Sequence, residues 1–205
     1  MGLNIVTQAG DFDPFVKYNG KAGRWYVQKD EQEVEVSNPV FVADFDKIKT
    51  GWFYFKTGSA PEKVFDKSLS EAAPKPERTF VDDKGVVRDC FRRGFELRLF
   101  SNAHFGGVVV MNGSSMHLNN AINALYDAYE AGKAANPGML PVVACSGTEP
   151  MKDKHGTNYK PLMSIVKWVA RPVELDSGAV SAPATQAPQP VPQPAPAPAA
   201  SISEF

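Results

Sequence analysis

The stretch GGVVVMNGSSMHLNNAINALYDAYEAGKAANPGMLPVVACS, residues 106–146, decides the fold of this chain. Its first part, Gly106–Met111, is apolar and β-branched and therefore predicts a strand. From Ser115 onward the apolar residues recur with helical spacing, and the pattern ends near Gly132, ahead of a Pro-Gly pair. Leu140–Ser146 then returns to the composition of a strand. We therefore expect one helix with strands on both sides.

The rest of the chain before residue 176 also reads mainly as strands separated by turns. Alternating and β-branched residues, broken by Gly, Asn and Pro, are typical of antiparallel strands. The segment from Ala60 to Arg93 is less regular, because it contains three prolines and an Asp-Lys-Gly turn, and it predicts a loop or hairpin insertion. The predicted strands are residues 24–28, 33–43 with a break at Asn38-Pro39, 51–56, 95–101, 106–111, 140–146 and 159–169, with a polar loop at 147–156.

Several antiparallel strands, one helix and two further strands follow one another in the order found in an OB barrel. In that fold the helix between the third and fourth strands covers the bottom of the barrel. A β-sandwich rarely carries such a helix, and a parallel sheet would need several. We therefore predict a mainly β domain at residues 1–175 with one principal helix, an OB-like antiparallel β-barrel in which residues 60–93 are a loop insertion.

Residues 176–205 have a composition that does not support a packed core. Seven prolines lie within residues 183–198, among Ala, Gln and Val, and such a stretch is expected to be a disordered, extended and solvated tail. It ends with Ile202, Glu204 and Phe205 beside the terminal carboxylate. Large apolar side chains next to charges predict a terminal peptide that another protein binds. A frayed end with two chance apolar residues is the alternative.

Charge and cysteine content limit the class of protein. The formal net charge is −1, which argues against a polycation, so any site for a polyanion must be a local patch. Cys90 and Cys145 are far apart and form no CxxC motif, which argues against a disulfide framework or a zinc site and favours the cytoplasm. The sequence contains no long apolar run and no basic start followed by an apolar stretch, so we expect neither a membrane span nor a signal peptide.

Motifs of catalysis are missing from the sequence. It contains no Walker A loop, no dinucleotide-binding glycine motif, no nucleophile elbow and no zinc-protease helix. Asp153 and His155 could contribute to the metal site of a nuclease, but no second carboxylate accompanies them. We therefore expect no catalytic residue, no metal and no cofactor, and a nuclease is the least supported function.

Basic and aromatic residues lie close together in several predicted strands and loops. Residues 17–26 interleave Lys and Arg with three aromatic rings. Single-stranded nucleic acid requires this combination, because cations follow the phosphates and flat rings accept unstacked bases, each stack contributing roughly 1–3 kcal/mol. The residues predicted to bind nucleic acid are Lys17, Tyr18, Lys21, Arg24, Trp25, Trp52, Tyr54, Arg98, Phe100, Lys152, Lys154, Tyr159 and Lys160.

The same residues have an alternative role, because one face of each strand in a β domain must form the core. The cations could equally form an ordinary solvated surface, since acidic residues such as Glu33 and Glu35 are close to them in sequence. We assign to the interior Phe53, Phe55, Phe95, Leu97 and Leu99. Left open between the core and a binding surface are Trp25, Tyr26, Trp52, Tyr54 and Phe100.

These features together resemble single-stranded DNA-binding proteins of bacteria and phages. Phe15–Tyr26, Phe105–Val109 and Lys154–Pro161 are similar to strings in a phage and prophage group of these proteins, and the resemblance covers most of residues 5–175. It implies an OB-type domain and a tail whose terminal acidic residue and Phe recruit replication and repair enzymes; in some phage members the tail competes with DNA for the binding cleft. This tail departs from the bacterial pattern, because it ends with one acidic residue where bacterial tails have several. The strength of recruitment is therefore in doubt.

The sequence predicts a non-catalytic protein that binds single-stranded DNA without sequence preference and acts in phage DNA replication or recombination. Its expected partners are single-stranded DNA and, through the tail, replication or recombination proteins in the cytoplasm of a bacterial host. No membrane is expected, and self-association stays open. The alternative is a protein-binding β-barrel, such as a virion or assembly component, with a docking tail. A DNA binder would keep its affinity without residues 177–205, whereas a docking module would lose its partner.

Overall fold

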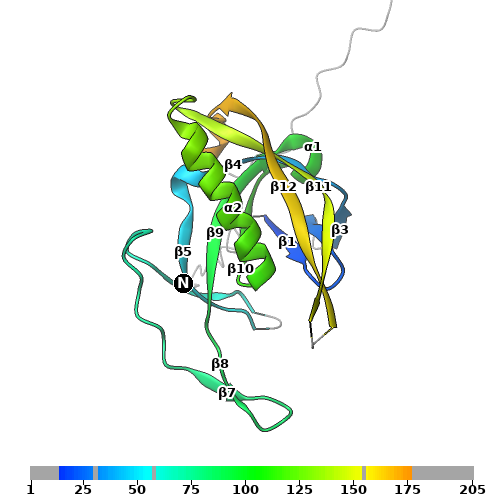
Figure 1. Cartoon of the computed structure of the whole chain (residues 1–205), viewed down its shortest axis with the longest axis vertical. Helices are drawn as coiled ribbons and strands as arrows, with labels where there is room; N and C mark the ends of the chain where they lie inside the picture. The colour runs from blue at the N-terminus through cyan, green and yellow to red at the C-terminus, as the bar shows by residue number, and fades with distance from the viewer. Residues whose placement is uncertain (1–13, 30–31, 57–58, 154–155, 177–205) are drawn as a thin grey trace, which may run out of the picture.

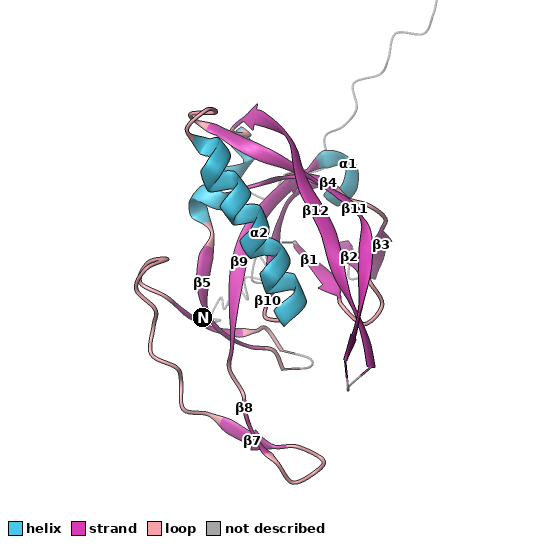
Figure 2. Cartoon of the chain, viewed as in Figure 1, coloured by secondary structure: helices cyan, strands magenta, loops and turns pink. Residues whose placement is uncertain are grey.

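The computed structural model describes residues 14–29, 32–56, 59–153 and 156–176. Strands dominate them, accompanied by one long helix, α2 (Figure 1, Figure 2). The prediction of a mainly β fold with one principal helix is confirmed. In chain order the elements are β1 (Phe15–Asn19), β2 (Arg24–Lys29), β3 (Gln32–Val36), β4 (Val40–Ala43), η1 (Phe45–Lys47), β5 (Lys49–Tyr54), β6 (Glu62–Phe65), β7 (Thr79–Val81), β8 (Val87–Asp89), β9 (Arg92–Ser101), α1 (Asn102–Phe105), β10 (Gly107–Gly113), α2 (Met116–Lys133), β11 (Met139–Asp153), β12 (Gly156–Ala170) and η2 (Val173–Leu175).

Ten strands form one continuous sheet, and β7 and β8 form a separate small one. The order across the main sheet is β12-β11-β4-β9-β10-β1-β2-β3, and β5 pairs with β9 and β6 at its side. Neighbours are antiparallel except β1 and β10, which are parallel. Within the described residues the outermost strands, β12 and β3, do not pair with each other. The sheet is therefore not closed into a barrel, and the predicted barrel is not confirmed.

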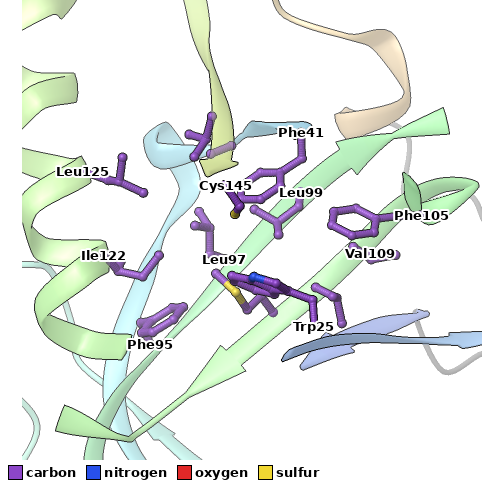
Figure 3. Packing of buried hydrophobic residues seen from close by; sticks show 14 of the residues in the cluster. Trp25, Phe41, Phe95, Leu97, Leu99, Phe105, Val109, Ile122, Leu125 and Cys145 are labelled. Carbon is purple, nitrogen blue, oxygen red and sulfur yellow. The ribbon is translucent and has the colours of Figure 1, made fainter. Parts of the chain in front are cut away.

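Helix α2 lies in the chain between β10 and β11, where the sequence predicts it. The Ser115 hydroxyl accepts a hydrogen bond from the Leu118 amide at 3.4 Å and begins the helix as its N-cap. Ile122 and Leu125 are buried and face the sheet across the core (Figure 3). No helix in the described part of the chain has the length and apolar character that a membrane crossing requires.

The core fills the inner face of the sheet, and strand alternation selects its members. Phe53, Phe95, Leu97 and Leu99 are buried, with at most 3% of each residue exposed, as predicted. The prediction for Phe55 is wrong, because this residue follows the end of β5 and is 48% exposed. Its ring stacks against that of Phe53, with the two ring centroids 6.1 Å apart.

The last described segment is fastened to the other face of the sheet. Leu175 is fully buried beside Val42 and Leu140. Arg171 donates two hydrogen bonds, at 2.9 and 2.5 Å, to the carboxylate of Asp44, which is itself fully buried. This ion pair satisfies the buried charge of Asp44 and connects the last described segment to the body.

Residues 66–91 form an arm that extends from the body and carries β7 and β8 toward its tip (Figure 1). Gly85, with a φ of 75°, lies in the turn between these strands, in a backbone region that favours glycine. At the base of the arm the carboxylate of Asp66 accepts hydrogen bonds from Arg93 at 2.8 and 2.6 Å and from the Ala73 amide at 2.8 Å. The arm is thus an excursion from the sheet with an anchored base.

The predicted polar loop at residues 147–156 is wrong for most of its length. The pairing of β11 and β12 runs from Met139 with Ala170 to Asp153 with Gly156, so ladder hydrogen bonds satisfy this polar backbone. Residues 147–153 have few apolar side chains, so the sequence pattern did not indicate that β11 extends this far. Strand β1, which has only five residues, is also absent from the predicted strands.

Candidate nucleic-acid interface

Two rings of the β1–β2 hairpin pack in or against the core. Trp25 is 3% exposed and lies among buried residues, with its ring centroid 4.9 Å from that of Tyr18 and 6.3 Å from that of Phe41 (Figure 3). The Tyr18 hydroxyl donates a hydrogen bond to the backbone oxygen of Tyr159 at 3.0 Å. Burial raises the pKa of Tyr18 to about 12, so the hydroxyl stays a donor at neutral pH. The burial of Trp25 argues against its predicted role in binding nucleic acid, whereas that of the half-buried Tyr18 stays a prediction.

Two cations of the same hairpin, Lys17 and Arg24, lie on its outer face and are already paired. Lys17 forms an ion pair with Glu33, and Arg24 Nη1 lies 2.7 Å from Glu35 Oε2. These carboxylates reduce the positive potential that a phosphate would meet. Lys17 and Arg24, both predicted to bind nucleic acid, therefore contribute little uncompensated charge.

Trp52 and Tyr54 share one face of β5, as predicted, and cations of the arm and its base cover both rings. The guanidinium of Arg93 lies 5.3 Å from the ring centroid of Trp52, and that of Arg78 lies 5.0 Å from the ring centroid of Tyr54. Trp52 Nε1 also donates a hydrogen bond to the Ala73 oxygen at 2.9 Å. Both rings are half-buried. A base could stack on the covered faces only after the arm moved.

Arg98 and Phe100 lie on the face of β9 that holds the end of the described chain. Arg98 Nη1 donates a hydrogen bond to the Leu175 oxygen at 2.9 Å. Phe100 packs against the small apolar cluster that includes Leu175 and Leu140. Both side chains are half-buried and take part in these contacts, and their predicted role in binding nucleic acid stays a prediction.

The β1–β2 turn and the β11–β12 hairpin, far apart in sequence, meet at Tyr159. The Tyr159 amide donates a hydrogen bond to the Gly20 oxygen at 2.7 Å, beside the bond from the Tyr18 hydroxyl. Gly23, with a φ of 69°, lies against the Tyr159 ring, and a Cβ atom there would lie only 3.0 Å from the ring. A glycine is therefore needed both for the turn and for this contact.

Lysines around this junction are uncompensated. Lys21 and Lys152 are exposed, Lys160 is half-buried, and none has a carboxylate partner among the residues that the structure describes. Lys152 pairs with Thr157, and Tyr159 with Pro150, so the side chains of Lys152 and Tyr159 share one face of the hairpin. Lys160, the next residue, points to the other face. The junction therefore combines free cations with a half-buried ring.

The predicted residues thus do not form one continuous surface. Lys21 and Lys152 lie near Tyr159, and Lys160 points to the other face of the β11–β12 hairpin, opposite Glu149. The other described ones contact the core, the arm, the last described segment or a carboxylate. Outside the described residues lie Lys154, Ile202, Glu204, Phe205 and His155 of the alternative metal site.

Sequence reasoning missed a cavity of about 440 Å³ at the base of the arm. Phe55 and Phe80 line it and are 48% and 45% exposed, and Lys56 and Arg92 line it as well. The sequence offers one signal for this site: Lys56 and Arg92 lie close to the two ends of the 60–93 insertion. The sequence predicts a loop or hairpin for that insertion and an interior position for Phe55.

No family model matches this chain, and neither a curated protein nor a solved structure matches it. Among the described residues, no group of three or more His, Cys, Asp or Glu side chains is arranged to hold a metal ion. The geometry of the described residues is therefore the basis for a proposed function.

Proposed function

We propose that this protein binds single-stranded DNA without sequence preference and acts in phage DNA replication or recombination. The observation that carries the proposal is the junction at Tyr159, near which lie Lys21 and Lys152, from distant segments and with no carboxylate partner among the described residues. Uncompensated cations attract the phosphate backbone, and a neighbouring ring offers a surface to unstacked bases. The cytoplasm of a bacterial host is the proposed site of action.

The strand order around α2 supports an OB-like plan for this function. β4, β9 and β10 are neighbours, α2 follows in the chain, and β11 returns to pair with β4. The β11–β12 hairpin then corresponds to the loop between strands four and five, which binds oligonucleotides in many OB folds. We infer that the β1–β2 hairpin takes the closing position, since β1 pairs with β10 and its turn bonds to Tyr159 of β12.

The C-terminal tail supports the resemblance to phage single-stranded DNA-binding proteins. Residues 177–205 are Pro- and Ala-rich and end in Glu204-Phe205. A Pro-rich segment extends its tip away from the body, where a replication or recombination protein can bind the apolar and acidic end. The tail is thus proposed as the partner-binding part of the molecule.

The test is fluorescence anisotropy of a labelled 30-nucleotide oligo-dT across a range of salt concentrations. The wild type should bind at low salt and weaken as salt rises, because phosphate contacts release counterions. Lys152→Ala should weaken binding and lower the slope of log affinity against log salt by about 0.7, the value for one lost contact to a single strand.

The matched control is Lys167→Ala. Lys167 is an exposed lysine of β12, the strand that carries Tyr159, and it lies about 26 Å from Tyr159 at 3.3 Å per residue. Its binding should equal that of the wild type. Absence of binding by the wild type, or binding that salt leaves unchanged, would overturn the proposal. Equal effects of Lys152→Ala and Lys167→Ala would remove the junction as its site.

One observation favours a second function, a protein-binding module. Val81 and Val87 on the arm are 65% and 64% exposed and lie opposite each other on one face of the β7–β8 pair, and exposed apolar residues favour protein contacts. Removing residues 177–205 separates the two functions. A DNA binder keeps or improves its affinity for oligo-dT, whereas a docking module loses its protein partner and never binds DNA.

A further inference from the structure

The cavity at the base of the arm is walled by aromatic rings on two sides. It has a volume of about 440 Å³ and lies where the end of β5 meets the arm. Phe55 comes from the β5 side and Phe80 from β7 in the arm, so a residue that precedes the insertion and one within it face one space. A volume of this size falls in the range of about 300–1,000 Å³ typical of small-molecule sites.

The two rings are partly exposed to solvent and do not belong to the hydrophobic core. Phe55 is 48% and Phe80 is 45% exposed. Phe55 stacks on buried Phe53, with an interplanar angle of 12° and a centroid distance of 6.1 Å, which fixes its orientation while leaving its remaining surface exposed. A fixed, exposed ring beside a second exposed ring suits a flat, unpaired aromatic ligand.

The charges of the cavity specify that ligand further. Lys56 and Arg92 line it, are exposed, and make no ion pair within the described residues. The carboxylate that also lines it, Asp89, is paired with Lys75. The uncompensated charge is therefore positive and lies beside aromatic walls, which is the combination that a nucleobase with its phosphate requires.

We propose that this cavity is a subsite for one unpaired nucleobase of single-stranded DNA, with Phe55 and Phe80 contacting the base and Arg92 and Lys56 the adjoining phosphates. The inference rests on the proposed function and adds a second contact region, distinct from the junction at Tyr159. It also assigns a role to the arm, which brings one wall of the subsite against the end of β5.

The test compares matched variants in the oligo-dT anisotropy assay. Phe80→Ala should weaken binding about fivefold to 150-fold, the range that corresponds to about 1–3 kcal/mol for one stacked base at 1.4 kcal/mol per factor of ten. Val81→Ala is its control, because this neighbour is 65% exposed on the other face of β7, and it should bind as the wild type does. Arg92→Gln should weaken binding, whereas Lys84→Gln, which removes one charge in the β7–β8 turn, should not.

A second measurement identifies the contact directly. Oligo-dT that carries 5-iododeoxyuridine is photocrosslinked to the full chain, and the modified peptide is identified by mass spectrometry. Crosslinks at Phe55 or Phe80 support the subsite. This readout uses the wild type and therefore does not depend on how well Phe55→Ala or Phe80→Ala folds.

The outcomes separate the subsite from the function. If the wild type binds oligo-dT, but Phe80→Ala and Arg92→Gln bind equally well and no crosslink falls on Phe55 or Phe80, the subsite is overturned while the proposed function stands. If the wild type does not bind, both fall. If Val81→Ala and Lys84→Gln weaken binding as much as the cavity variants, the whole arm contributes and the specific base site is overturned.

Discussion

Replacing Asp66 by Asn tests whether one carboxylate fastens the arm to the body. The Asp66 side chain is 3% exposed and accepts hydrogen bonds from Arg93 at 2.8 and 2.6 Å, from the Thr50 hydroxyl at 2.5 Å and from the Ala73 amide at 2.8 Å. Asn keeps the shape and one acceptor oxygen, but it removes the charge and turns an amide donor toward donors.

The magnitude follows from this geometry. Hydrogen bonds to a charged group contribute about 1.5–3 kcal/mol each, and removing one partner of a buried ion pair costs about 3–5 kcal/mol. The Arg93 side chain is 41% exposed, so water solvates it when the carboxylate is gone. We therefore expect Asp66→Asn to lower the free energy of unfolding by about 2–3 kcal/mol. The control is Glu71→Gln, which breaks an exposed pair with Lys67 and should cost less than about 1 kcal/mol.

The same carboxylate predicts how stability depends on pH. The hydrogen bonds from Arg93, and then those from Thr50 and Ala73, hold the pKa of Asp66 well below its ordinary value of 3.8. The unfolded chain therefore binds this proton at a higher pH than the folded chain does. The contribution of Asp66 to stability is complete above about pH 5 and is lost as the pH falls below the ordinary pKa. Between about pH 5 and pH 2 the wild type should lose stability more steeply than Asp66→Asn.

The assay is urea unfolding followed by tryptophan fluorescence, at pH 7 and at acidic pH. Detachment of the arm as a local unit would leave the global unfolding free energy unchanged. The rate of trypsin cleavage after Arg78 and Lys84 in the arm is therefore measured as well, and it should rise in Asp66→Asn. Equal unfolding free energies and equal cleavage rates for wild type and variant would refute the reasoning.

Further predictions concern the rest of the body. Arg171→Met leaves the buried carboxylate of Asp44 without its partner and should cost about 3–5 kcal/mol in urea unfolding; a cost below about 1 kcal/mol would contradict this. Gly94→Ala places a Cβ against the backbone oxygen of Gly113, and the strain between β9 and β10 should cost about 1–3 kcal/mol; an unchanged unfolding midpoint would count against it. Burial raises the pKa of the Cys145 thiol to about 12, so a thiol reagent at pH 8 should modify it only after unfolding, and peptide mass spectrometry checks this.

Local sequence patterns predicted the helices and strands that bury one face and expose the other. The helix beginning at Ser115 was found because its apolar residues recur every three or four positions and one face packs on the core. The break at Asn38 was found because Asn-Pro interrupts strands, and Asn38 indeed has a φ of 44°. The alternation in Phe95–Ser101 also placed the buried residues correctly.

The candidate site was predicted only in part, because periodicity does not identify partners. Trp25 and Lys17 are close in sequence, but alternation sends one into the core and the other to a carboxylate. Phe55 continues the inward pattern of β5, yet it lies just past the end of that strand and is 48% exposed. Lys152 and Tyr159 were predicted, but their meeting with the turn at Lys21 depends on hydrogen bonds between distant segments.

The sequence by itself determined most strands of the sheet, the single principal helix and the Pro-rich composition of residues 177–205, since these depend on residues that are neighbours in the chain. Only the tertiary structure decided that the sheet stays open, that the arm covers Trp52, and that Phe80 approaches Phe55. The physical reason is that pairing and burial depend on segments brought together in space, and the same cation is free or neutralised according to which carboxylate folding brings near it.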